Sequence, residues 1–75
     1  MNKIDFTKIF DLIDQNKPPE EIKRTLRLPP GCKFKTWYED RWNQAEGCWE
    51  KRRCGETYEC DDPINNNTYC TPWSC

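Results

Sequence analysis

The chain has 75 residues, of which a third are charged, and its mean hydropathy is −1.14. This length allows one small domain, whose core usually needs the support of disulfides, a metal or a partner. A formal net charge of −1 gives no whole-protein electrostatic argument for nucleic acid or an anionic membrane, and no apolar run reaches the length typical of a signal peptide or a membrane span.

Residues 1–31, which contain neither cysteine nor tryptophan, are expected to form a helical hairpin. Asn2 or Asp5 is the candidate N-cap of the first helix. Its apolar residues recur at the spacing of one helical face: Phe6, Ile9, Phe10 and Ile13. The sequence NKPPEE then restarts a second helix, because proline suits a first turn and glutamate suits the positive end of the helix dipole. The apolar positions of that helix are Ile22, Leu26 and Leu28.

A third helix is expected over Lys33–Glu46, with Gly47 as its C-terminal stop. Its apolar side carries Phe34, Trp37 or Tyr38, Trp42 and Ala45. Farther along, residues 56–60 and 67–71 are typical of short β-strands, and the turn-rich sequence DDPINNN lies between them. The predicted fold class is a small disulfide-rich α+β protein with an N-terminal helical hairpin, a third helix and a cysteine-bounded β-hairpin.

The six cysteines define a cysteine-rich part, residues 32–75, that follows the cysteine-free helical head. An even count with irregular spacing is typical of three disulfides, each of which stabilises a fold by roughly 2–4 kcal/mol. The expected disulfide cysteines, for which fifteen pairings are open, are Cys32, Cys48, Cys54, Cys60, Cys70 and Cys75. Disulfides and the sequon at Asn66 indicate a secreted protein or another oxidising compartment. The opening MNKIDFTKIF is instead typical of a cytosolic protein, which would fit reduced or modified thiols.

Neither a metal nor a cofactor is expected. The successive cysteines are separated by 15, 5, 5, 9 and 4 residues, whereas structural zinc sites usually pair cysteines two to four residues apart. The chain contains no histidine, and its acidic residues 56–62 lack the interleaved pattern of a calcium-binding loop. Because no base stands beside a cysteine, nucleophilic catalysis is not expected either, and the sequence favours a protein that is not an enzyme.

The segment Glu20–Trp42 resembles a helix-turn-helix. Its apolar residues approximate the buried positions of that motif: Ile22, Leu26, Leu28, Phe34 and Trp37. The resemblance implies a nucleic-acid-binding protein with basic side chains turned toward phosphates. These side chains are Lys33, Lys35 and Arg41. Lys23 and Arg27 stand where the motif usually has a small residue and a glycine, and the structural alternative is a helical packing unit with solvated charges.

Residues 47–75, GCWEKRRCGETYEC followed by DDPINNNTYCTPWSC, are similar to peritrophin-type chitin-binding modules. The resemblance implies exposed aromatic rings that stack on sugar: Trp49, Tyr58, Tyr69 and Trp73. The interval from Cys54 to Cys60 is shorter than this family usually has. The structural alternative is that the same rings cover the disulfides as a miniature core.

The head and tail together also resemble the leader and core of ribosomally made, enzyme-modified peptides. In such a precursor a processing enzyme would grip residues 1–31, and cysteine, serine and threonine side chains of the tail would be modified. The amphipathic pattern of residues 34–45 favours a folded domain instead.

The leading interpretation is a single domain, residues 1–75, that acts as a non-enzymatic disulfide-stabilised interaction module of the toxin, inhibitor or ligand type. Its expected partner is a protein surface, with a glycan second and nucleic acid not expected. Disulfides would preorganise the recognition side chains, including a rigid loop over Lys51–Arg53. The candidate binding residues are Trp49, Lys51, Arg52, Arg53, Tyr58, Tyr69 and Trp73.

Overall fold

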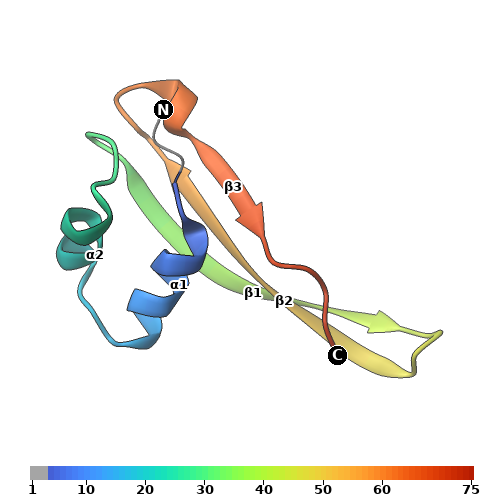
Figure 1. Ribbon diagram of the computed structural model, residues 1–75. Helices are drawn as coiled ribbons and strands as arrows, with labels where there is room; N and C mark the ends of the chain where they lie inside the picture. Colours follow the sequence, from blue (N-terminus) through green and yellow to red (C-terminus); the bar gives the residue numbers. More distant parts are fainter. Residues whose placement is uncertain (1–3) are drawn as a thin grey trace.

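The computed structural model describes residues 4–75, which form two short helices followed by a three-stranded antiparallel sheet (Figure 1). Helix α1 spans Phe6–Asp14 and α2 spans Pro19–Leu26. Strands β1, Lys33–Asn43, and β2, Cys48–Tyr58, form a long hairpin, and β3, Asn67–Cys70, pairs with the other side of β2. A short 3-10 helix, η1, Pro63–Asn65, lies between β2 and β3. The small α+β character of the fold is therefore confirmed.

The two N-terminal helices begin where the sequence predicts. The Asp5 side chain accepts a hydrogen bond from the backbone N–H of Lys8 and caps α1. Asn2, the other candidate cap, lies outside the described residues. Helix α2 starts at Pro19 and ends at Leu26, and its C-cap residue Arg27 adopts a left-handed conformation at φ 50°. Neither helix is long or apolar enough to cross a membrane.

The predicted third helix is wrong, because residues 33–43 form β1 and residues 44–47 form a tight hairpin loop. Every residue of β1 pairs with one of β2, from Lys33 opposite Tyr58 to Asn43 opposite Cys48. Gly47, expected as a helix stop, supplies a positive φ of 65° in that loop. Without a second helix at this place, the helix-turn-helix interpretation is wrong as well.

Side chains alternate between two faces of the sheet, and each face has its own character. On the helix-side face, α1 packs against the sheet: a Cβ added at Gly55 would lie 2.8 Å from Cδ1 of Phe6 and 3.1 Å from Cε1 of Phe10. The Tyr69 ring of β3 stacks on Phe6 on the same side, with ring centroids 5.8 Å apart. Only a glycine leaves room for this close approach of helix and sheet.

The apolar core lies between the two helices and this face of the sheet. Its buried side chains are Phe6, Ile9, Phe10 and Ile22, and the partly buried side chains around them are Ile4, Leu12, Ile13, Leu26, Leu28 and Phe34. All but Phe34 belong to the cysteine-free head. The head and the cysteine-rich part consequently share one core, which does not fit the separate leader and core of a precursor peptide.

Three disulfides are formed, and no free cysteine remains in the described residues. Cys54–Cys70 joins β2 to β3 at directly opposite positions. Cys48–Cys75 ties the chain end to the start of β2, and Cys32–Cys60 links the residue before β1 to the chain just after β2. The disulfide prediction is confirmed, and such a framework fits an oxidising environment.

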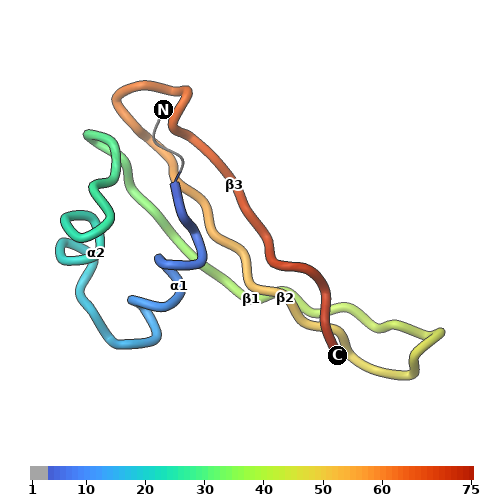
Figure 2. Tube along the Cα trace, in the orientation of Figure 1, coloured from blue at the N-terminus to red at the C-terminus, as the bar shows by residue number. Residues whose placement is uncertain are grey.

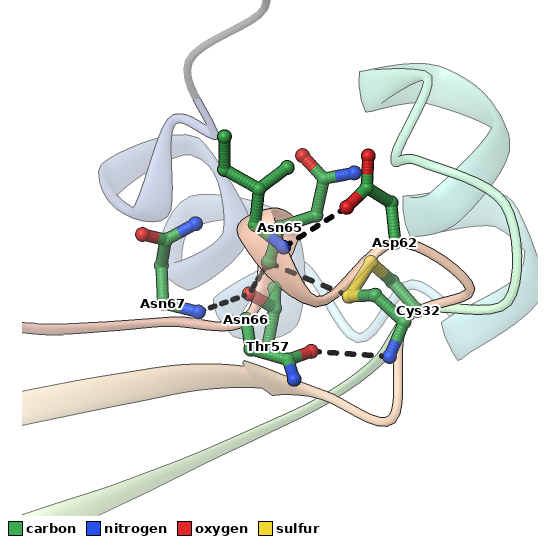
Figure 3. The surroundings of a disulfide bond; sticks show 8 residues. Cys32, Thr57, Asp62, Asn65, Asn66 and Asn67 are labelled. Carbon is green, nitrogen blue, oxygen red and sulfur yellow. Dashed lines mark hydrogen bonds between the residues drawn. A yellow bond between two sulfur atoms is a disulfide. The ribbon is translucent and has the colours of Figure 1, made fainter.

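The connection between β2 and β3 is held next to Cys32–Cys60 by a small polar network (Figure 3). The buried Thr57 hydroxyl donates to the carbonyl of Asn65 at 2.7 Å and accepts from the backbone N–H of Asn67 at 3.0 Å. The Asn66 side chain accepts from the backbone N–H of Cys60 at 3.1 Å. These bonds satisfy the polar groups of the turn and fix the end of the sheet opposite the hairpin loop.

Candidate interaction surface

The far end of the β1–β2 hairpin projects beyond both helices (Figures 1 and 2). We call this part, residues 38–53, the arm. On the helix-side face the arm carries three aromatic side chains that no helix covers: Tyr38 is 68 % exposed, Trp42 52 % and Trp49 61 %. Side chains this large are seldom left in water together unless they serve as a contact surface. The arm is therefore the candidate interaction surface.

The two tryptophans of the arm stand directly opposite each other on the two strands. Their rings meet edge to face with centroids 5.6 Å apart. Such an aromatic pair contributes about 0.5–1.5 kcal/mol beyond its buried area, so Trp42 and Trp49 also hold the strands of the arm together. Their mutual contact leaves one rigid aromatic surface rather than two mobile side chains.

The other side of the sheet, the ion-pair face, has its charges matched across the strands. Four ion pairs run along it: Lys33–Glu59, Lys35–Glu56, Glu39–Arg52 and Arg41–Glu50, with N–O distances between 2.6 and 3.2 Å. The two lysine pairs are largely exposed and add little stability each, whereas the carboxylate of Glu50 is only 12 % exposed and depends on Arg41 as its partner. This face consequently offers far less unmatched chemistry to a partner than the aromatic face of the arm.

The C-terminal segment adds a tryptophan to the ion-pair face. Trp73 contacts two guanidinium groups, those of Arg41 and Arg52, each 4.4 Å from the centre of its ring. This placement depends on one extra residue in the C-terminal segment. Cys54 is opposite Cys70 and Lys51 is opposite Ser74, so a separation of three residues in β2 is paired with a separation of four in the segment beside it. The bulge turns Trp73 away from the helix side, where strict alternation would put it.

Arg53 marks the boundary between the helix-covered half of the sheet and the arm. Its guanidinium donates to both carboxylate oxygens of Asp14 at 2.9 Å, which anchors α1 to β2. The same group lies 4.7 Å from the Phe10 ring centre and 5.2 Å from that of Tyr38. Because only 14 % of its side chain is exposed, Arg53 is occupied with contacts inside the protein.

Glu39 is the best-connected carboxylate of the ion-pair face. It accepts hydrogen bonds from the indole N–H of Trp37 at 2.9 Å and from Nε of Arg52 at 2.7 Å. These two donors, the indole first, lower the pKa of Glu39 below its usual value of 4.5. They stabilise the ionised form in the folded protein only.

We expect Glu39 to make stability depend on acid. Because its folded pKa is lowered, its contribution is fully present above pH 4.5 and is lost as the pH falls through the folded value. The urea concentration at the unfolding midpoint should therefore fall more between about pH 5 and about pH 2 for the native chain than for Glu39→Gln. Parallel pH profiles for the two proteins would contradict this assignment.

The structure separates the seven predicted binding residues into different environments. Trp49 and Lys51 lie on the exposed aromatic side of the arm, on strand β2 rather than in a loop. Arg52 and Trp73 stack on the ion-pair face, and Tyr58 lies there next to Lys35, whose ammonium group is 5.4 Å from its ring centre. The other two, Arg53 and Tyr69, contact helix α1.

Two members of the arm surface, Tyr38 and Trp42, were not among the predicted binding residues. They were assigned to the apolar side of a helix, and the same residues are exposed when the segment is a strand. Phe34, Tyr38 and Trp42 all stand at even positions, so a strand over this segment would place them on one face; that shared parity was the signal that could have found them.

Among the residues that the structure describes, one cluster of metal-binding residue types occurs, formed on the ion-pair face by Glu39, Cys54 and Cys70. The two sulfur atoms are bonded to each other, so they do not act as thiolate ligands. The Glu39 carboxylate is already shared between Trp37 and Arg52. The cluster therefore carries no metal assignment.

Comparisons with models of protein families, with curated proteins and with solved structures returned no match for this chain.

Proposed function

We propose that this protein is a non-enzymatic, secreted interaction module that recognises a protein surface through the aromatic side of its arm. The observation that carries the proposal is the exposure of Tyr38, Trp42 and Trp49 on one face of a braced hairpin. Tyrosine and tryptophan dominate the energetically important contacts of protein interfaces, because they provide a large contact area with few rotatable bonds.

Preorganisation of the arm supports the same proposal. The tryptophans contact each other, and Cys48–Cys75 ties the β2 strand of the arm to the chain end. On the opposite face, Arg41 and Arg52 are paired with carboxylates and stack on Trp73. A surface that is already ordered loses little conformational entropy when it binds, so more of the contact energy appears as affinity.

A glycan is the second candidate partner, and the exposed Trp49 ring is the observation that favours it. The apolar faces of sugar rings stack on such side chains. Trp73, which the chitin-binding resemblance includes, is occupied by two guanidinium groups, and Tyr69 lies against Phe6 and Phe10. Fewer rings are therefore available for sugar than the resemblance implies, and a protein partner is the leading proposal.

The test is a binding screen of the oxidised chain against arrayed extracellular protein domains and, separately, arrayed chitin oligosaccharides. The double variant Trp42→Ala, Trp49→Ala should lose at least about tenfold in affinity for a protein that binds, since truncating a hot-spot tryptophan at an interface costs about 2 kcal/mol or more. The matched control is Ile64→Ala, which removes an exposed apolar side chain, 72 % accessible, from η1 instead of the arm.

Equal binding by the double variant and the native chain would contradict the proposal, provided that circular dichroism shows both to be folded. Binding to oligosaccharides without binding to any protein would favour the glycan alternative.

A further inference from the structure

Strand β1 is the outer strand of the sheet, because the strand order is β1-β2-β3. It is eleven residues long, contains neither proline nor glycine, and keeps continuous register with β2 over its whole length. Proteins usually blunt such an edge with charged side chains, proline, a bulge or a covering element. The opposite edge of the sheet is interrupted by Pro72 and the bulge beside it, whereas β1 keeps a regular backbone and carries charged side chains of both signs.

The direction of the backbone groups of β1 follows from the hydrogen bonds of β2. Lys51 bonds to Ser74 through both its N–H and its C=O, and the Arg53 carbonyl accepts from the N–H of Thr71. The odd-numbered residues of β2 therefore direct their backbone groups toward the C-terminal segment, and the even-numbered residues direct theirs toward β1. It follows that the odd-numbered residues of β1 bond to β2, while its even-numbered residues direct N–H and C=O outward.

In residues 4–75 no backbone group of β1 makes a hydrogen bond outside the sheet. The outward-directed groups of the arm belong to Tyr38, Asp40 and Trp42. These groups form a regular row of donors and acceptors at strand spacing, which is the template for adding a further strand. In Figure 1 this section of β1 extends past both helices, so a second strand can approach it.

We propose that a second copy of this chain occupies the edge, so that two arms pair antiparallel through their β1 strands. In an antiparallel dimer with Asp40 at the twofold axis, Tyr38 faces Trp42 of the other copy, and Glu39 faces Arg41 of the other copy. The even-numbered pairs exchange backbone hydrogen bonds, and the odd-numbered pair brings opposite charges together at the shorter separation.

Charge complementarity favours this register. Moving the axis to Tyr38 places Lys35 opposite Arg41 of the other copy. An axis at Asp40, Glu39 or Arg41 places two like charges opposite each other in every case, but only the axis at Asp40 also pairs opposite charges, Glu39 with Arg41, on both sides of it.

The dimer has a consequence for the surface of the arm. All even-numbered side chains of β1 lie on the helix-side face, so the pairing places the aromatic sets of both copies on one continuous six-stranded face. The dimer requires no outside partner. It uses the backbone edge, whereas the proposed recognition uses the side chains of the aromatic face, so the two fail in different experiments.

Sedimentation velocity of the oxidised chain over a range of concentrations tests the proposal. Edge pairing of one short section buries less area than a standard interface, so we expect a dissociation constant between about 10 µM and 1 mM. Asp40→Pro should leave a monomer at every concentration, because it removes an outward N–H and no bond to β2. Asp40→Asn should tighten the dimer about two- to fivefold by removing the like charge at the axis.

A mixture of isotope-labelled and unlabelled native chains provides a second measurement that does not rely on a variant. In the proposed register, filtered nuclear Overhauser effects should connect the Hα of Glu39 in one copy with the Hα of Arg41 in the other. A native chain that stays monomeric at the highest concentration would overturn the proposal. So would a dimer that Asp40→Pro leaves intact and that Trp42→Ala abolishes, because that dimer would form through the aromatic face.

Discussion

Replacing Ile9 by alanine is expected to lower the thermal midpoint of the protein by roughly 10 °C or more. Ile9, a residue of α1, is fully buried in the core that α1 shares with α2 and the sheet. Truncating a buried isoleucine costs about 2–5 kcal/mol, because the lost apolar contact is accompanied by a cavity. In a domain of this size that is a large share of the total stability. Differential scanning calorimetry under oxidising conditions measures the effect.

The control for this experiment is Ile64→Ala, which makes a related truncation at a side chain that is 72 % exposed and should leave the midpoint nearly unchanged. The comparison also tests whether the head belongs to the folded domain. If residues 1–31 were a detachable leader, Ile9→Ala would not alter the unfolding of the cysteine-rich part, and equal midpoints for the two variants would contradict the shared core.

Removing the Cys54–Cys70 bridge by double alanine substitution is expected to destabilise the protein by about 3 kcal/mol. The bridge closes a loop with a sequence separation of 16, and Cys54 is fully buried beneath the ion-pair face. Strand β3 has only four residues, so without the bridge its amide protons should lose most of their protection from hydrogen exchange. Chemical denaturation and hydrogen exchange together measure both effects.

A double alanine variant at Cys48 and Cys75 is the matched comparison. That bridge fastens the chain end, where Cys75 is exposed, so loss of protection should be confined to residues 71–75 and β3 should keep its slow exchange. Loss of β3 protection in both variants, or in neither, would show that Cys54–Cys70 has no special part in holding β3.

The sequence predicts the N-terminal helices well because their signals are local. The apolar spacing of Phe6, Ile9 and Phe10 identifies the buried face of α1, and Asp5 is the cap that the sequence indicates. Pro19 stands at the first position of α2, as expected for a residue without a backbone donor. These features require no knowledge of the rest of the fold.

Strand β1 was predicted wrongly because residues 33–46 satisfy two periodicities. Phe34, Tyr38 and Trp42 recur every four residues, which fits one helical face and equally fits alternate positions of a strand. Aromatic and β-branched residues in this segment favour the strand, and pairing with β2 decides the outcome. That pairing is a nonlocal contact, which a local window does not contain.

The order of charged residues along the sequence contains a pattern that would have located the β1–β2 hairpin. When the sequence is folded back between residues 45 and 46, opposite charges meet repeatedly: Lys35 with Glu56, Glu39 with Arg52, Asp40 with Lys51 and Arg41 with Glu50. The run Lys51–Arg53, interpreted as a loop, is the basic half of this complementary pattern. Cross-strand charge matching of this kind specifies a register.

The same register explains the disulfide connectivity that the sequence left open. Cys54 and Cys70 are directly opposite in adjacent strands, and the bulge at Pro72 and Trp73 brings Cys75 to the face that carries Cys48. Once β1 and β2 are paired, Cys32 and Cys60 both stand at the other end of the hairpin. Spacing along the chain contains none of this information.

Disulfide mapping tests the central claim, that three bridges brace a hairpin whose far end displays an aromatic surface. The oxidised chain is cleaved without reduction: trypsin cuts between Cys48 and Cys54, glutamyl endopeptidase cuts between Cys54 and Cys60, and chymotrypsin cuts after Trp73. Mass spectrometry then identifies which peptides remain linked.

The structure predicts the linkages Cys32–Cys60, Cys48–Cys75 and Cys54–Cys70, with an intact mass six hydrogens below that of the reduced chain and no alkylation before reduction. Any other pairing would contradict the register that places Tyr38, Trp42 and Trp49 on one exposed face. Six freely alkylated thiols in the native protein would contradict the disulfide framework itself.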